Sequence, residues 1–282
     1  MSSGKSDFEP LDVSALRTAL VRPNGGYAAL DVVERTGSTN VDLLAAARSG
    51  AADRTVLIAE AQTAGQGRRS RGWVSPPGAG LYLSVLLRPA GVPVSRLPWL
   101  TLLAGVALAR TAESVGVDAA LKWPNDLLLG RPRRKAAGVL AEISTADGPA
   151  VVLGIGLNVH PLPAGVPLGA GGLAPTSLAD ENASDIDRTV LAVRLLAELA
   201  TWEGAWRQHS GDPVAAGLRD EYQPRCETLG QRIRVELPGS AELSGRAVGL
   251  GDDGTLLLRA DDGVEHALSA GDVVHVRGAE SR

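Results

Sequence analysis

Cysteine is nearly absent from this chain: Cys226 is the only one among 282 residues. A lone cysteine forms neither an intramolecular disulfide nor a cysteine-rich metal site, and it is typical of a reducing compartment. The histidines are also few and lack the spacing of metal ligands. They are His160, His209, His266 and His275. With no G-x-S-x-G motif either, the sequence predicts neither a zinc enzyme nor a hydrolase.

Excess positive charge and long hydrophobic runs are missing as well. The net charge is −4 and the isoelectric point is about 5.6, so no overall basic field attracts DNA or anionic lipid. The longest apolar stretches, such as residues 97–109, are far shorter than the ~20 residues of a membrane span. The polar residues 1–10 do not resemble a signal peptide. We therefore expect a cytoplasmic protein.

Lysine is rare, because only three of the 28 basic residues are lysines: Lys5, Lys122 and Lys135. The simplest explanation is an arginine bias of the source. Where such a chain keeps a lysine, a compact, rotatable ammonium can be needed in place of a planar guanidinium. Lys122 and Lys135 both lie in segments that carry other chemically capable side chains.

The hydropathy pattern predicts two domains that differ in their secondary structure. Strands are expected at residues 28–33, 55–60, 81–87, 119–123, 126–129, 135–144 and 150–159, and helices at 11–20, 41–49, 98–115 and 189–209. From residue 232, short strands alternate with tight turns instead. We predict an α+β (mixed α/β) domain over residues 1–227 and a small β-barrel over residues 228–282.

Two long loops rich in glycine and proline, residues 65–80 and 161–175, have the composition of lids. The first begins Gly65-Gln66-Gly67-Arg68-Arg69-Ser70-Arg71-Gly72-Trp73. Glycines let backbone N–H groups approach an anion, and arginines bind phosphate or carboxylate groups. The loop matches neither the P-loop nor the Rossmann pattern. A merely solvated basic loop is the alternative.

Three further segments combine polar side chains with buried strands. They are Lys122-Trp123-Pro124-Asn125-Asp126, the stretch from Arg134 and Lys135 to Glu142 with Gly138 inside it, and Gly154-Ile155-Gly156-Leu157-Asn158-Val159. The first could bind an anion or a metal ion. The alternative is a structural turn in which Pro124 sets the geometry and Asp126 accepts from a backbone N–H. For Lys135, an edge-strand lysine that prevents aggregation is the alternative. Two glycines destabilise a buried strand unless something packs on the backbone there. Asn158 then points either at a ligand or into its own sheet, and this segment taken alone favours the structural role.

Taken in order, and together with Ser38-Thr39-Asn40, these segments resemble the biotin protein ligases. The resemblance runs from about residue 28 to the C-terminus. It implies a catalytic domain with the fold of class II aminoacyl-tRNA synthetases and biotin ligases, followed by an SH3-like barrel. It also implies an ATP-dependent, AMP-forming enzyme. Biotin and MgATP form biotinyl-5′-AMP and pyrophosphate, and a lysine of a biotin carboxyl carrier protein of the acyl-CoA carboxylases, such as acetyl-CoA carboxylase, then takes the biotinyl group.

The resemblance assigns roles to individual residues. Biotin contacts are expected at Ser38, Thr39, Asn40, Gln62, Gln66, Gly67, Arg68, Lys135, Gly138 and Gly156. Nucleotide contacts are expected at Arg68, Arg69, Arg71, Trp73, Asn125, Lys135 and Asn158. The expected catalytic residues are Lys135, Arg68, Asp126 and Lys122, with Mg²⁺ near Asn125 and Asp126. The chain departs from the usual family pattern at Gln66, where arginine is common, and at Ser70, where glycine is usual.

The implied chemistry agrees with the residues themselves. A carboxylate that attacks a phosphate needs cations aimed at the developing charge, and Lys135 and Arg68 can supply them. We expect the Lys135 side chain to be exposed when no ligand is bound. The mixed anhydride is water-sensitive, so the two loops are expected to cover it.

Alternatives remain at this stage. A lipoate-type cofactor ligase shares the architecture, although the Gly/Arg loop and the C-terminal strands argue against it. A non-catalytic biotin or nucleotide binder is opposed by the retention of Lys122 and Lys135. The stretch before the first motif strand is too short for the winged-helix domain of many relatives, so we expect no specific DNA binding. We expect a monomer or a weak homodimer.

Overall fold

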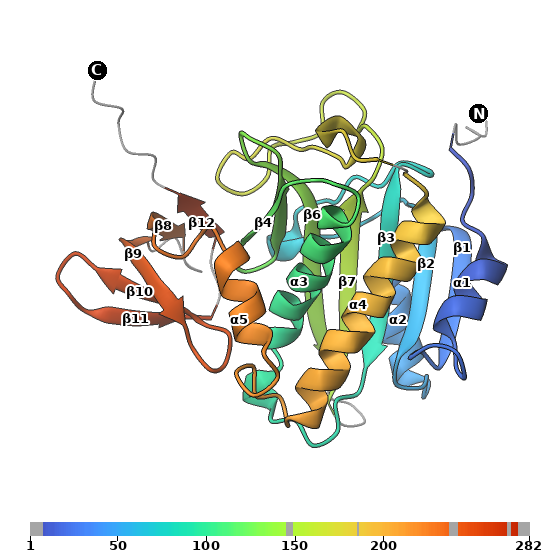
Figure 1. Cartoon of the computed structure of the whole chain (residues 1–282), viewed down its shortest axis with the longest axis horizontal. Coiled ribbons are helices and arrows are strands. Elements are labelled where there is room, and N and C mark those ends of the chain that lie inside the picture. Colours follow the sequence, from blue (N-terminus) through green and yellow to red (C-terminus); the bar gives the residue numbers. More distant parts are fainter. Residues whose placement is uncertain (1–7, 145–148, 185, 237–241, 270–271, 276–282) are drawn as a thin grey trace.

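A seven-stranded sheet forms the centre of the protein (Figure 1). The structure, a computed structural model, describes residues 8–144, 149–184, 186–236, 242–269 and 272–275. The strands are β1 (Ala29–Thr36), β2 (Thr55–Gln62), β3 (Gly80–Leu87), β4 (Ala119–Lys122), β5 (Asp126–Leu129), β6 (Arg134–Ser144) and β7 (Ala150–Asn158). Their order is β1-β2-β3-β7-β6-β5-β4. Only β1 and β2 pair in parallel; the other neighbours are antiparallel.

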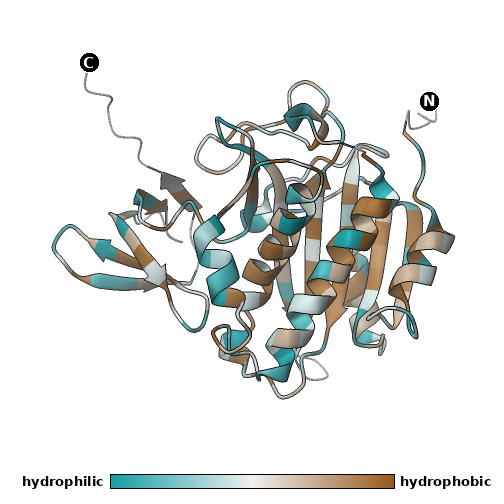
Figure 2. Ribbon diagram, viewed as in Figure 1, coloured by the Kyte–Doolittle hydropathy of each residue, from teal (hydrophilic) through white to brown (hydrophobic). Residues whose placement is uncertain are grey.

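Helices cover both faces of this sheet, as Figure 1 shows. On one face lie α1 (Val13–Leu20), α3 (Trp99–Glu113) and α4 (Arg188–Gln208), and on the other lies α2 (Thr39–Arg48). Most residues of α3 are apolar and buried, because the helix packs between the sheet and α4. Figure 2 shows the same division, with hydrophobic residues concentrated on the strands and on α3. The predicted mixed α/β architecture is confirmed.

The C-terminal strands form a second, five-stranded sheet in the order β11-β10-β9-β8-β12. They are β8 (Arg232–Glu236), β9 (Glu242–Leu250), β10 (Leu256–Ala260), β11 (Glu265–Leu268) and β12 (Asp272–His275). Within the described ranges no strand pairing joins β11 to β12, so no closed barrel is formed there. The sheet is attached to the larger part through tryptophans: Trp99 Nε1 donates to the Asp252 carbonyl at 3.0 Å and Trp123 Nε1 to the Gly254 carbonyl at 3.1 Å.

Most expected elements are present, with shifts at their ends. The second helix starts at Thr39, slightly before the expected position, so Thr39 and Asn40 belong to its first turn. The short helix α5 (Leu218–Tyr222) was not predicted. Over the described residues, no helix combines the length and the apolar character needed to cross a membrane.

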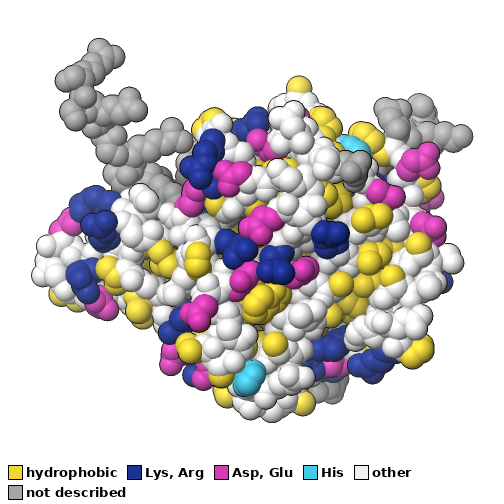
Figure 3. Space-filling model, viewed as in Figure 1, with side chains coloured by type: hydrophobic (Ala, Val, Ile, Leu, Met, Phe, Trp, Pro, Cys, Tyr) yellow, Lys and Arg dark blue, Asp and Glu magenta, His cyan; other side chains and the backbone are white. Residues whose placement is uncertain are grey.

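Charges of both signs alternate on the face that carries α3, α4 and α5 (Figure 3). They are paired with each other. Arg110 donates to Glu198 at 2.8 Å and to Glu221 at 2.9 Å, and Arg225 binds Glu113 at 3.0 Å. These contacts connect the three helices across their outer side, and they leave the chemistry to the opposite face of the sheet.

Candidate active site

The alternation of side chains along β7 separates the packed core from the site. Leu153, Ile155 and Leu157 belong to the main hydrophobic core. The residues between them, Gly154, Gly156 and Asn158, face the side of the sheet that carries α2 and line a cavity there. Because side chains in a strand point alternately to the two faces, the repeated glycines leave the sheet flat and open on the α2 side.

This cavity has a volume of about 790 Å³. Its walls come from the first turn of α2, the segment 62–76, the start of β5, the strands β6 and β7, and the loop 161–175. The predicted site residues that line it are Ser38, Thr39, Asn40, Gln62, Gln66, Gly67, Arg68, Arg71, Trp73, Asn125, Asp126, Lys135, Gly138, Gly156 and Asn158. The topology therefore brings together five motifs that are far apart in sequence.

Two predicted site residues, Arg69 and Lys122, lie outside this lining. Arg69 donates to the carbonyl of Glu236 in β8 at 2.7 Å, so its side chain points to the C-terminal sheet. Lys122 is buried, and its Nζ donates to the carbonyl of Ala170 at 2.9 Å. Its position favours a role in holding the loop 161–175 over a direct contact with the reacting atoms.

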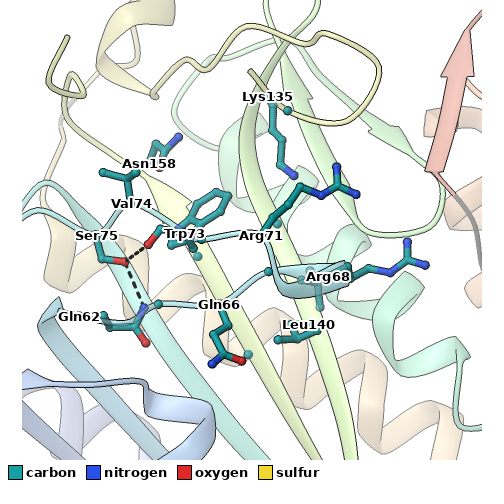
Figure 4. A pocket seen from close by; sticks show the side chains of 18 of the residues that line it. Gln62, Gln66, Arg68, Arg71, Trp73, Val74, Ser75, Lys135, Leu140 and Asn158 are labelled. Carbon is teal, nitrogen blue, oxygen red and sulfur yellow. Dashed lines mark hydrogen bonds between the residues drawn. The ribbon is translucent and has the colours of Figure 1, made fainter. Parts of the chain in front are cut away.

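One end of the cavity is lined by amide and hydroxyl groups. The Gln62 amide oxygen accepts from the Thr39 backbone N–H at 2.9 Å, and the Gln62 Nε2 donates to Ser75 Oγ at 3.1 Å. Ser38 is the N-cap residue of α2, and its side chain makes no capping hydrogen bond. Figure 4 shows the Gln62–Ser75–Trp73 contacts, with Gln66 on the same side. This end offers hydrogen-bond donors and acceptors but no formal charge.

The other end is cationic (Figure 4). Lys135 Nζ lies 2.6 Å from Asp126 Oδ1. Arg68 donates to Asn125 Oδ1 at 3.3 Å, while Asn125 Nδ2 is itself bound to the Val139 carbonyl at 2.9 Å. Arg71 lines the same region. The ammonium and two guanidinium groups create a site suited to anions.

The expectation that the Lys135 side chain is exposed is wrong. It is 19% exposed, and the carboxylate that it pairs with is 6% exposed. Its backbone is bound to the loop 161–175 as well, because Lys135 N donates to the Ala174 carbonyl at 2.8 Å. The ion pair holds the ammonium at the cavity wall before any ligand arrives.

Trp73 lies over a platform made by two glycines. Gly138 of β6 and Gly156 of β7 are directly paired across the two strands. A Cβ at Gly156 would lie 2.4 Å from Trp73 Nε1, and a Cβ at Gly138 would lie 3.4 Å from Trp73 Cζ3. The Lys135 ammonium is 5.7 Å from the centre of the indole ring. The glycines therefore let the indole pack directly on the backbone.

Two polar atoms at this wall have no partner among the described residues, Trp73 Nε1 and Asn158 Oδ1. The other end of the Asn158 amide is fixed, because its Nδ2 donates to the Thr176 carbonyl at 2.9 Å. Buried polar atoms without partners are costly, and at a cavity wall they indicate a polar ligand.

The Gly/Arg segment forms a hairpin over the cavity. Trp73 N donates to the Gly65 carbonyl at 2.8 Å, and Gly67 N donates to the Arg71 carbonyl at 2.7 Å. At its tip Arg69 and Ser70 have φ values of +55° and +56°. This left-handed region favours glycine, which gives a physical reason for the glycine that the resemblance expects at position 70.

Sequence reasoning missed several residues of the site. Ser75, Leu140 and the apolar residues of the loop 161–175 line the cavity. Ser84 and Glu142, which lie on strands of the main sheet, form hydrogen bonds with Asn40. The sequence does mark Ser84, because this serine interrupts the otherwise hydrophobic run from Leu81 to Leu87. The others show their role only once the strands are paired.

The histidines whose side chains the structure describes, His160, His209 and His266, do not line this cavity. His160 stacks on Phe8 with 4.0 Å between ring centroids, and burial lowers its pKa. Over the described ranges, no three or more His, Cys, Asp or Glu side chains are grouped in a way that could hold a metal ion.

Comparisons with known proteins identify relatives for both parts of the chain. The model of the biotin/lipoate A/B protein ligase family matches residues 32–158, and that of the biotin protein ligase C-terminal domain matches residues 228–276. The biotin–[acetyl-CoA-carboxylase] ligase of Mycobacterium tuberculosis is 45% identical over 273 residues, which cover 95% of this chain and 97% of that protein.

Solved structures give the same result. The biotin protein ligase of Aquifex aeolicus in complex with biotin and ATP superimposes with a TM-score of 0.70 at 26% identity, covering 89% of this chain and 100% of that one. The biotin protein ligase of Leishmania major in complex with biotinyl-5-AMP gives a TM-score of 0.56 at 25% identity, covering 86% and 99%.

Proposed function

The chain belongs to the biotin protein ligases, and from this we propose that its cavity is where biotin is activated by ATP. The enzyme is an ATP-dependent, AMP-forming biotin–[acetyl-CoA-carboxylase] ligase. It joins biotin to AMP with release of pyrophosphate and then transfers the biotinyl group to a lysine of a biotin carboxyl carrier protein. A lipoate-type ligase and a non-catalytic binder are not favoured.

The observation that carries this function is the division of one cavity into an uncharged polar end and a cationic end. Biotin has the same division, with a cyclic urea at one end and a carboxylate at the other. We assign the urea to Ser38, Thr39 and Gln62, whose amide and hydroxyl groups match its carbonyl and N–H groups. The carboxylate then reaches Lys135 and Arg68.

At the cationic end, two anions must meet. The biotin carboxylate oxygen attacks the α-phosphorus of ATP, and the pyrophosphate leaves. Lys135 and Arg68 offset the repulsion between carboxylate and phosphate and the charge that develops at phosphorus. Trp73 and Asn158 line the wall on which the adenosine is expected to lie.

Magnesium enters this reaction as the companion of the ATP phosphates. Mg²⁺ prefers a few protein oxygens together with substrate phosphates, and Asp126 Oδ and Asn125 Oδ1 at the cationic end fit this preference. Both side chains already have protein partners, Lys135 and Arg68. We therefore propose that these residues hold the ion only together with the nucleotide.

The direct test is exchange of labelled pyrophosphate into ATP. We expect the exchange to depend on biotin. With lipoate it should be at least about 100-fold slower, because lipoate has no urea to bind at the uncharged polar end of the cavity. Incubation with biotin, MgATP and a biotin carboxyl carrier domain should then increase the mass of the carrier by one biotinyl group. Equal exchange with both acids, or an unmodified carrier, would contradict the proposal.

We expect ligand to protect the Gly/Arg hairpin from protease. Little apolar surface holds its tip down, and the adenylate gives its arginines a phosphate to bind. Trypsin should cleave after Arg68 or Arg71 in the ligand-free enzyme, and biotinyl-5′-AMP should slow that cleavage about tenfold or more. Cleavage after the exposed Arg48, outside the cavity, is the internal control. Equal rates at the hairpin with and without the adenylate would count against ligand-induced ordering.

We further propose that the chain consists of two domains. Residues 1–227 carry the catalytic cavity, and residues 228–282 form the C-terminal domain. This is supported by the change of strand pattern at residue 232. The acidic isoelectric point favours a protein that binds no specific DNA, and the single cysteine agrees with the cytoplasm. We propose a monomer or weak homodimer in solution.

A further inference from the structure

The Asn40 side chain lies across three neighbouring strands. Its amide sits over Gly154 of β7, where a Cβ would lie 2.1 Å from Asn40 Oδ1. On one side, Ser84 of β3 lies 2.6 Å from Oδ1. On the other side, Asn40 Nδ2 donates to Glu142 Oε2 at 2.7 Å and to the Leu140 carbonyl at 3.3 Å. Ser84, Gly154 and Leu140 form one row of paired residues across the sheet.

These partners fix the direction of the Asn40 amide. A carboxylate and a backbone carbonyl can only accept hydrogen bonds, so the NH₂ group of Asn40 must face Glu142 and Leu140. The amide oxygen then faces Ser84. Because an amide oxygen can only accept, the single hydroxyl proton of Ser84 goes to Asn40.

The direction of the Ser84 hydroxyl determines that of Thr39. Thr39 Oγ1 lies 2.7 Å from Ser84 Oγ and 3.2 Å from Gln62 Oε1. Ser84 has already used its proton, and Gln62 Oε1 is an acceptor. Ser84 Oγ is the nearer acceptor, and Gln62 Oε1 already accepts from the Thr39 backbone N–H at 2.9 Å. The hydroxyl proton of Thr39 therefore points to Ser84, inside the protein. Toward the cavity, Thr39 Oγ1 presents only lone pairs.

We infer that Glu142, Asn40 and Ser84 are positioning residues that make the Thr39 hydroxyl a hydrogen-bond acceptor for the ligand. An acceptor at this place selects a ligand with an N–H donor, which the urea of biotin has and an apolar ring lacks. This inference rests on the proposed function, because it places the urea of biotin at the uncharged polar end of the cavity. It also explains why a buried strand keeps the hydroxyl of Ser84, which is completely buried.

The test reverses one hydrogen bond and then restores it. In Asn40→Asp, two carboxylates would face each other where Asn40 Nδ2 now donates to Glu142 Oε2, and the row would lose its donor. We expect KM for biotin to rise about 10- to 100-fold in pyrophosphate exchange. In Glu142→Gln, the new amide oxygen still accepts from Asn40, and KM should stay within about threefold. The double variant Asn40→Asp/Glu142→Gln lets Gln donate to Asp, and KM should return to within about fivefold of the unmodified enzyme.

Two further variants separate positioning from general stability. Ser84→Ala should raise KM for biotin about tenfold or more while KM for ATP stays within about twofold. Thr111→Val also removes a buried hydroxyl, one that donates to the Ala107 carbonyl at 2.8 Å in α3, and should change neither KM. Unchanged KM for biotin in Asn40→Asp and Ser84→Ala, no rescue in the double variant, or equal increases for biotin and ATP would overturn the inference. An unmodified enzyme without biotin-dependent exchange would instead overturn the proposed function.

Discussion

Lys135→Ala is expected to slow the formation of biotinyl-5′-AMP by about 10²–10³-fold at saturating biotin and MgATP. The ammonium is a point charge that can bridge the carboxylate and the α-phosphate as they approach within ~3–3.5 Å. Its place at the wall is already set by Asp126 and by the Trp73 ring. The rate of a single turnover, followed by quenching and separation of the adenylate, measures the effect.

Lys135→Arg should be almost as slow, although it keeps the charge. Gly169 of the loop 161–175 lies against the lysine stem, with 3.1 Å from an ideal Cβ to Lys135 Cδ, so the longer, planar guanidinium does not fit the same place. Transfer from chemically made biotinyl-5′-AMP to the carrier should suffer less, because the adenylate already exists. An adenylation rate within tenfold of the unmodified enzyme in Lys135→Ala would remove Lys135 from the catalytic role.

Lys135→Ala should also lower the free energy of unfolding, for a separate reason. It leaves the buried Asp126 carboxylate without its cation, which costs about 1–3 kcal/mol. In the double variant Lys135→Ala/Asp126→Asn both charges are gone, so we expect the free energy of unfolding to recover while adenylation stays slow. Denaturant unfolding of the two variants separates the structural contribution of the ion pair from its contribution to rate.

The sequence predicted the site better than it predicted the contacts within it. Ser38–Asn40, the Gly/Arg segment, Lys135 and Asn158 could be selected because glycines, cations and amides interrupt apolar strands there. Glu142 could not, and Ser84 was marked only as a hydroxyl within an apolar strand. Each acts on Asn40 from a different strand, and no local pattern records which strands become neighbours. The contacts of the Arg69 and Lys122 side chains are of the same kind, since each binds a backbone carbonyl from a distant part of the chain and no local pattern records that contact.

The fold shows the same limit. Strand positions follow from local periodicity, so the seven strands of the main sheet were found with small shifts at their ends. The antiparallel pairing of β6 with β7 was expected, and it places Gly138 opposite Gly156. That Trp73 would lie on this pair was not foreseeable, because the tryptophan arrives from a hairpin that is distant from both strands in sequence. The consequence of that contact can be tested directly.

Gly156→Ala is expected to reduce kcat/KM for ATP by about 10- to 100-fold. The new methyl group would lie 2.4 Å from Trp73 Nε1 and 2.5 Å from Cε2, so the indole must leave the sheet. The hairpin that carries Trp73 would move with it, because Trp73 N is bound to the Gly65 carbonyl. Steady-state kinetics with varied ATP, together with the tryptophan fluorescence spectrum, would report both changes.

A graded series makes this prediction specific to the platform. Gly138→Ala meets Trp73 only at 3.4 Å, so its effect should be smaller, about two- to tenfold. Gly249→Ala in β9 meets nothing closer than 3.7 Å, from Leu257, and controls for alanine in a strand; it should leave kcat/KM within about twofold. The expected order is Gly156→Ala, then Gly138→Ala, then Gly249→Ala, because the clearance above each glycine increases in that order. Equal effects at all three positions would mean that an alanine in any strand lowers activity, and that contact with Trp73 is not the cause.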